Sequence, residues 1–146
     1  MATVAEILKS KSDQQVYVVA PSATVYDALR LMADKGIGAL LIQEGDDIQG
    51  IFTERDYARK IALMGRSSVD TPVREVMTTA VLFVQPHEST DACMQLMTGK
   101  RLRHLPVMEA GKLVGLVSIG DLVKQIISEQ QFTIEQMAHY IHGGGH

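Results

Sequence analysis

The feature that most constrains this chain is an internal repeat at a constant offset of 65 residues. Residues 21–62, PSATVYDALRLMADKGIGALLIQEGDDIQGIFTERDYARKIA, align without a gap with residues 86–127, PHESTDACMQLMTGKRLRHLPVMEAGKLVGLVSIGDLVKQII. Nine aligned pairs are identical, and Asp56 with Asp121 is one of them. Two copies do not make a solenoid, which stacks at least three repeats. The repeat therefore predicts a pseudo-symmetric pair of similar folding units.

Each copy contains the same series of local patterns. A short β-rich stretch ends before a proline, and apolar residues then recur at i, i+3, i+4 and i+7, as on one face of a helix. Two apolar runs joined by a Gly-containing turn indicate a hairpin, and a second helix follows. The unit is therefore β-α-β-β-α, repeated in an α/β (α+β) fold. The expected strands are 16–20, 39–42, 48–52, 81–85, 105–108 and 113–117, and the expected final helices run from 53 to about 64 and from 118 to about 128.

The repeat also predicts how the chain is divided. VAEIL near the N-terminus resembles VREVM at Val73, so each copy has a related upstream segment. FTIEQMAHYIH, residues 132–142, has the pattern of an additional amphipathic helix, and GGGH after it is expected to fray. We expect repeat 1 with an N-terminal helix over 3–66, a linker over 67–72, repeat 2 over 73–129 and a C-terminal helical extension with a frayed tail over 130–146.

Composition excludes several classes of protein. Apolar residues make up 46% and charged residues 21%, a balance typical of soluble globular domains. No apolar run approaches the roughly 20 residues of a membrane span, and the N-terminus lacks the apolar core of a secretory signal. The single cysteine, Cys93, fits a reducing compartment, so we expect a cytoplasmic protein. A net charge of −3 and the absence of Trp disfavour nucleic-acid binding.

The same motif opens the last helix of both copies: Thr53-x-x-Asp56 and Ser118-x-x-Asp121. It indicates a capping box, in which the hydroxyl and the carboxylate each accept a hydrogen bond from the other residue's amide. The same geometry also fits a nucleotide. A helix N-terminus favours phosphate, and a carboxylate can accept both hydroxyls of a ribose diol. Arg55 adds either a phosphate-binding cation or an ordinary surface charge.

A second feature is GKRLRHLP, residues 99–106, where basic residues continue from a helix end into a strand. Arg103 and His104 are poorly explained by the helix dipole alone and suit phosphate, whereas the matching stretch in copy one is GIGA. Weaker candidates are the terminal histidines, too few to hold a metal, and Cys93, which lies on an apolar helix face and is expected in the core. No catalytic motif is apparent, so we expect neither an enzyme nor a bound metal.

The tandem units, the endings GIFTERD and GLVSIGD, and the hairpin HLPVMEAGKLVG resemble a CBS domain pair, also called a Bateman module, over roughly residues 3–129. The chain is similar to stand-alone bacterial CBS-pair proteins. The resemblance implies a pseudo-twofold pair with two composite clefts for adenosine nucleotides. One cleft would join Thr53, Glu54, Arg55 and Asp56 to Ala80, Val81, Leu102, Arg103 and His104. The other would join Ser118, Ile119, Gly120 and Asp121 to Gln15, Val16, Ile37 and Gly38.

The resemblance further implies a regulatory sensor of adenine nucleotides, with AMP first and ADP, ATP or NAD(H) as alternatives. It would have no catalytic cofactor, would form a homodimer, and would signal to a protein partner by population shift. Asp56 and Asp121 would hold ribose. Because the first cleft gathers Arg55, Arg103 and His104, we expect it to take the more phosphorylated or tighter ligand. A nucleotide-hydrolysing enzyme and a purely structural module are the rival hypotheses.

Overall fold

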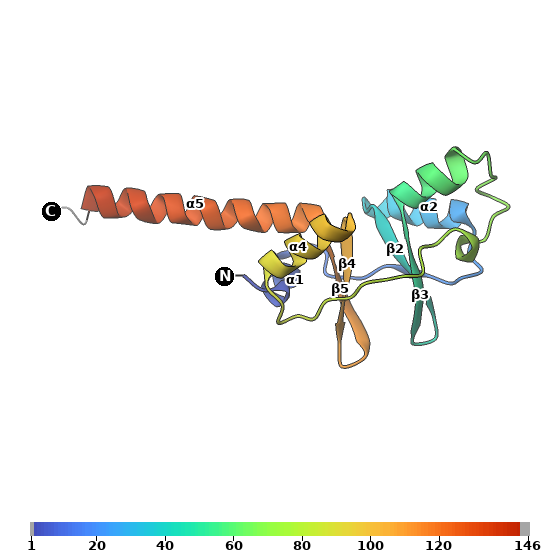
Figure 1. Cartoon of the computed structure of the whole chain (residues 1–146), viewed down its shortest axis with the longest axis horizontal. Helices are drawn as coiled ribbons and strands as arrows, with labels where there is room; N and C mark the ends of the chain where they lie inside the picture. Colours follow the sequence, from blue (N-terminus) through green and yellow to red (C-terminus); the bar gives the residue numbers. More distant parts are fainter. Residues whose placement is uncertain (1, 144–146) are drawn as a thin grey trace. The chain divides into compact units, whose positions relative to one another are not determined.

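The computed structural model describes residues 2–143, which form two compact units (Figure 1). The central unit is Gln15–Leu82. The terminal unit combines the described residues up to Gln14 with those from Phe83 onward. Each unit contains one β-hairpin with helices against it, so the mixed α and β class predicted from the sequence is confirmed.

The central unit holds a three-stranded sheet of order β1-β2-β3, in which β1 runs parallel to β2 and β3 antiparallel to it. Its core combines the apolar face of α2 with the inward residues of β2 and β3, including the fully buried Phe52. The elements are β1 (Val18–Val19), α2 (Val25–Lys35), β2 (Ala39–Glu44), β3 (Asp47–Thr53), α3 (Glu54–Asp56), the π-helical η1 (Tyr57–Ala62) and the 3-10 turn η2 (Val73–Glu75).

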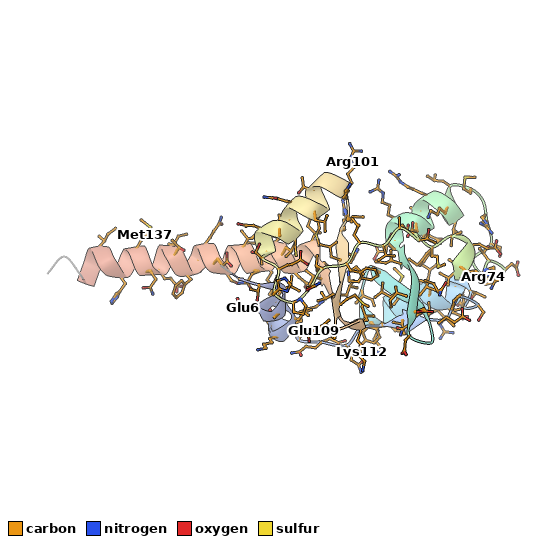
Figure 2. The ribbon with its side chains drawn as sticks, turned by 60° about the horizontal axis from the view of Figure 1, so that its bottom comes forward. Glu6, Arg74, Arg101, Glu109, Lys112 and Met137 are labelled. Carbon is orange, nitrogen blue, oxygen red and sulfur yellow. The ribbon has the colours of Figure 1, made fainter. Side chains whose placement is uncertain are left out.

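The terminal unit holds the antiparallel hairpin β4-β5, with an isolated parallel bridge from Val84 to Val107 beside it. Its core contains the fully buried Cys93, which confirms that this thiol is a packing residue. Figure 2 shows Glu109 and Lys112 at the turn of the hairpin. The elements are α1 (Val4–Ser10), α4 (Thr90–Lys100), β4 (His104–Glu109), β5 (Lys112–Ser118) and α5 (Ile119–Gly143).

Local sequence explains where the helices begin and end. Thr24 caps α2 by accepting from the Asp27 amide at 3.1 Å, and Asp27 accepts from Thr24 in return. The α2 helix stops at Gly36, whose φ of 64° lies in the left-handed region that glycine adopts without strain. The α4 helix begins after Ser89, whose hydroxyl accepts from the Ala92 amide at 3.1 Å.

Several expected elements differ from the structure. The strand expected over 16–20 is only Val18–Val19, and the helix expected from 53 to about 64 is the short α3, continued by the π-helical η1. The strand expected over 81–85 is reduced to the single bridge at Val84. The helices expected at 118–128 and 132–142 are one continuous helix, α5, because the segment between them contains neither Gly nor Pro to end it. The frayed end expected over 143–146 falls mostly outside the described residues, and Gly143 is still helical.

The boundaries of the compact units do not coincide with those of the sequence repeats. The upstream segment of repeat 1, α1, belongs to the terminal unit and lies against β5, whereas η2, upstream in repeat 2, lies against β3 of the central unit. The repeats and the compact units are therefore different divisions of the chain. The cause is that each hairpin completes its core with the upstream segment of the other repeat, such as Val4 and Ile7 in one unit and Val73 in the other.

In each hairpin, a glycine leaves room for the upstream segment that packs against the hairpin. A Cβ at Gly50 would lie 2.7 Å from the main-chain oxygen of Thr78 and 2.9 Å from the sulfur of Met77. A Cβ at Gly115 would lie 2.6 Å from a methyl group of Leu8. The absence of a Cβ thus lets the main chain of Thr78 approach closely at Gly50 and the side chain of Leu8 approach closely at Gly115.

We expect Gly50→Ala to destabilise the protein more than Gly115→Ala. At Gly50 the obstacle is main chain, held by two hydrogen bonds between Ile51 and Thr78, whereas at Gly115 it is the end of a flexible side chain. Overpacking of this kind costs about 1–3 kcal/mol, so Gly50→Ala should lie near the top of that range and Gly115→Ala near the bottom. Urea denaturation measures the difference.

Gly99→Ala is the matched control, because an added Cβ there meets nothing within 4 Å and Ala suits a helix better than Gly. It should leave stability unchanged or slightly raised. An equal or larger loss in Gly115→Ala than in Gly50→Ala would contradict this account of the packing.

Candidate functional site

Both predicted capping boxes are present. In the central unit, Thr53 donates its amide to Asp56 Oδ2 at 3.0 Å, and the Asp56 amide donates to Thr53 Oγ1 at 3.2 Å. In the terminal unit, Ser118 donates its amide to Asp121 Oδ2 at 2.8 Å, and the Asp121 amide donates to Ser118 Oγ at 3.1 Å. Each box closes a hairpin onto the helix that follows and fixes one carboxylate at the end of a strand.

The Asp56 carboxylate has a full set of donors. Its Oδ2 accepts from the amide and the hydroxyl of Thr53, and its Oδ1 accepts from the Thr78 hydroxyl at 3.0 Å. The Lys60 ammonium, one helical turn on, lies 3.0 Å from the same Oδ1 and also donates to the carbonyl of Val76 at 2.9 Å. Asp56 is 7% exposed, and four donors meet the roughly four lone-pair sites of a carboxylate.

The Asp121 carboxylate is less occupied. The amide of Ser118 and the ammonium of Lys11 both reach Oδ2, the latter at 3.0 Å, and Lys11 also donates to the Leu116 carbonyl at 2.8 Å. Within residues 2–143, no hydrogen bond reaches Oδ1 of Asp121. The Asp121 side chain is 21% exposed. This carboxylate can therefore accept a hydroxyl without losing an existing partner.

The basic residues at the start of β4 lie beside the terminal capping box. His104 is the cross-strand partner of Ser118, and the Ile119 amide donates to the Arg103 carbonyl at 2.8 Å. The antiparallel hairpin causes this placement, since the first residue of β4 faces the last residue of β5. Arg103 and His104 thus share one unit with Ser118 and Asp121.

The His104 ring lies among charged groups of the same unit. Burial lowers its pKa below the ordinary value. The Asp121 carboxylate opposes this by raising the pKa, while the cations Lys11 and Arg103 lower it further. The His104 ring is therefore influenced by the charges of one carboxylate and two cations of its own unit.

In the central unit the equivalent positions carry no charge. Ala39 is the cross-strand partner of Thr53, and the Glu54 amide donates to the Gly38 carbonyl at 3.1 Å. A glycine and an alanine therefore stand beside this capping box, where an arginine and a histidine stand in the terminal unit. The two half-sites share a backbone and differ in charge.

The two composite clefts expected from the sequence join residues across the units, and this pairing stays a prediction. In the central unit lie Gln15, Val16, Ile37, Gly38, Thr53, Glu54, Arg55, Asp56, Ala80 and Val81. In the terminal unit lie Leu102, Arg103, His104, Ser118, Ile119, Gly120 and Asp121.

Three residues that contact the aspartates were missed by the sequence analysis: Lys11, Lys60 and Thr78. Lys60 could have been found, because it follows Asp56 at i+4 on a predicted helix. Lys11 and Thr78 come from upstream segments that pack on hairpins distant in sequence, and no local spacing indicates such contacts.

Three other kinds of function can be checked on the described residues: thiol chemistry, metal binding and membrane crossing. Burial raises the pKa of the Cys93 thiol, and the charge of Glu88 raises it further, so this thiol is poorly suited to act as a thiolate. Residues 2–143 contain no group of three or more His, Cys, Asp or Glu side chains arranged for a metal ion. None of their helices combines the length and the apolar character that crossing a membrane requires.

Comparison with known proteins identifies relatives along most of the chain. The family model of the CBS domain matches residues 4–63 and 73–128. The chain is 38% identical over 150 residues to the mitochondrial CBS domain-containing protein CBSX3 of Arabidopsis thaliana, covering 97% of this chain and 73% of the relative. It is 34% identical to the CBS domain-containing protein YhcV of Bacillus subtilis, covering 84% and 87%. No catalytic family is indicated.

Solved structures show the same fold. A protein with CBS domains from Burkholderia ambifaria is 61% identical, with a TM-score of 0.85 over 91% of this chain and 99% of that one. A CBS-domain containing protein from Agrobacterium tumefaciens is 38% identical, with a TM-score of 0.80 over 85% and 98%.

The environment of His104 generates a pH prediction. Because the folded state lowers the pKa of this ring, the unfolded chain takes up the proton first as the pH falls through about 6.5. The free energy of unfolding should therefore decrease on acidification from about pH 6.5 down to the folded-state pKa. His104→Gln should reduce this slope, as measured by urea denaturation between pH 5 and 7.5.

His87→Gln is the control, because His87 is exposed on the same unit. It should leave the slope unchanged. A wild-type slope that persists in His104→Gln would show that other groups are responsible.

Proposed function

The chain belongs to the CBS domain family, as a pair of such domains, and from that premise we propose that it is a regulatory module that binds an adenine nucleotide. AMP is the first choice of ligand, with ADP, ATP and NAD(H) as alternatives. The observation that carries the proposal is the Asp121 carboxylate, which is fixed by a capping box and keeps one oxygen available for a ribose hydroxyl.

The chemistry around Asp121 suits the three parts of a nucleotide. A carboxylate oxygen accepts from the ribose hydroxyls. Ser118 and the first turn of α5 offer a hydroxyl and the positive end of a helix to phosphate. The main chain of the expected cleft residues Gln15 and Val16 would meet the adenine. These pairings remain part of the proposal.

A distant relative supports the ligand class. A solved CBS domain pair that is 21% identical to this chain, with a TM-score of 0.76, is described in complex with 5′-methylthioadenosine and S-adenosyl-L-methionine. Both compounds contain adenosine. We therefore include S-adenosylmethionine in the test of this chain's ligand.

We propose that the ligand acts by population shift. A nucleotide that binds one arrangement of the pair more tightly than another raises the population of that arrangement. A protein partner would then read the changed surface, for which α5 is the proposed contact. The predicted cytoplasmic location stays a prediction, and the Arabidopsis relative is named as mitochondrial.

Thermal denaturation with AMP, ADP, ATP, NADH and S-adenosylmethionine tests the ligand class. A ligand at about one hundred times its dissociation constant should raise the midpoint by roughly 5–10 °C, because it binds only the folded state. Asp121→Asn should reduce the shift while leaving the apo midpoint within a few degrees, since the amide oxygen still accepts from Ser118.

Other results of these experiments would favour one of the rival hypotheses or another binding site. No shift with any compound would favour a structural module with empty clefts. Turnover of ATP with Mg²⁺ would favour a nucleotide-hydrolysing enzyme, and a shift that is unchanged in Asp121→Asn would place the ligand elsewhere.

We further propose that the protein forms a homodimer through α5. In Figure 1 this helix extends beyond α1 and α4 of its own unit, and Figure 2 shows Met137 on the half of α5 that extends beyond them. Alternating steps of four and three residues define a row, hereafter the α5 row: Val123, Ile127, Gln130, Ile134, Met137 and Ile141. This is the heptad spacing of a coiled coil, with Ile at every a position.

The exposure of the α5 row supports a second copy as its occupant. Ile127, Ile134, Met137 and Ile141 are 59–66% exposed, and the row is about 27 Å long at 1.5 Å per residue. Heptad a and d residues pack best against an identical row, and Gln130 can pair with its own copy. Relatives with another assembly exist: a CBS-CP12 protein at 30% identity is described as hexameric.

Ile134→Asp should convert the dimer to a monomer, because it places a charge in the centre of the α5 row. Phe132→Asp is the matched control, since Phe132 is equally exposed, at 63%, but lies off the row. Analytical ultracentrifugation distinguishes the two. A wild-type monomer, a hexamer, or a Phe132→Asp variant that dissociates as readily would contradict the proposed interface.

A further inference from the structure

A lysine is bound to each of the two capping-box aspartates. Lys60 lies 3.0 Å from Asp56 Oδ1 and donates to the Val76 carbonyl at 2.9 Å. Lys11 lies 3.0 Å from Asp121 Oδ2 and donates to a carbonyl of β5 at 2.8 Å. The lysines are not related by the repeat, because Lys60 comes from the helix that carries Asp56, whereas Lys11 is the C-cap of α1.

The two aspartates differ in what they can still accept. Asp56 is buried and already takes four donors, so a ribose hydroxyl must displace Thr78 or Lys60. The known donors of Asp121 both reach Oδ2. A hydroxyl can therefore bind at Oδ1 with no loss of a hydrogen bond already present in the described part of the chain.

Positive charge also gathers around Asp121. Lys11, Arg103 and His104, hereafter the Lys11 cluster, share the terminal unit, and the charges of Lys11 and Arg103 both act on the His104 ring. An ammonium has three donors, and two of those on Lys11 have partners in Asp121 and Leu116. The third can donate to a phosphoryl oxygen without breaking either contact.

We propose that Lys11 is a phosphate-binding residue, and that the Asp121 half-site, rather than the Asp56 half-site, takes the phosphorylated ligand more tightly. This inference rests on the proposed function, since it names the part of the nucleotide that Lys11 recognises. It reverses the ranking expected from the sequence, which grouped Arg103 and His104 with Asp56. It also makes the N-terminal helix part of the binding site, through its C-cap.

Isothermal titration of Lys11→Met against AMP and adenosine tests the assignment, because methionine keeps the aliphatic length and removes the charge. The variant should lose about tenfold or more in affinity for AMP, as expected for a charge-assisted hydrogen bond, and less than about threefold for adenosine. Lys11→Arg should retain most of the AMP affinity, and Lys60→Met is the matched control, expected to lose less than about threefold.

An equal loss for AMP and adenosine would mean that Lys11 only positions Asp121, and a larger loss in Lys60→Met would restore the ranking expected from the sequence. Either result overturns the inference. Urea denaturation of Lys11→Met shows whether the fold is retained, and Lys11→Arg supplies the test if it is not.

Titration with inorganic pyrophosphate separates this inference from the proposed function. If the wild type binds pyrophosphate through Lys11 but binds no adenosine compound, the proposed ligand class is wrong and the anion site stands. If neither AMP nor pyrophosphate binds the wild type more tightly than Lys11→Met, the inference is wrong.

Discussion

The hydrogen bonds between Thr53 and Asp56, and between Ser118 and Asp121, join each hairpin to the helix that follows it. The carboxylate satisfies the amide at the end of the strand, and the hydroxyl satisfies an amide of the first helical turn. Without these bonds, strand and helix would leave polar groups unsatisfied where the chain turns. The same geometry fixes a carboxylate beside a helix N-terminus, so a structural cap and a ligand site use the same atoms.

Much of the fold could be predicted because the sequence contains the same pattern twice, so that each copy can be checked against the other. A pattern that occurs twice at one offset, such as the hairpins ending at Thr53 and Ser118, is far less ambiguous than a single occurrence. The exchange of upstream segments could not be predicted, since VAEIL and VREVM resemble each other and either would fit either hairpin. Long-range packing decided it, through contacts such as Leu8 with Gly115 and Met77 with Gly50.

The candidate site, like the fold, could be predicted only in part. Its backbone framework follows from motif spacing, which correctly gave both capping boxes. Its charges do not, because Lys11, the C-cap of α1, and His104, the first residue of β4, are distant in sequence from Asp121 or come from another element. Arg103 and His104 were grouped with Asp56 across the two units, and that pairing stays a prediction, whereas within the terminal unit the hairpin register places His104 opposite Ser118.

The terminal unit connects the proposed binding site to a distant surface through one helix. Asp121 lies in the first turn of α5, and the exposed α5 row continues to Ile141. The N-terminal segment braces this helix, since the Ala2 amide donates to Glu129 Oε1 at 3.2 Å and Lys11 reaches Asp121. A ligand that engages Lys11 and Asp121 together would act on both segments at once. Coupling requires that the ligand and the partner favour the same arrangement of a shared element, and α1 with α5 supplies such an element.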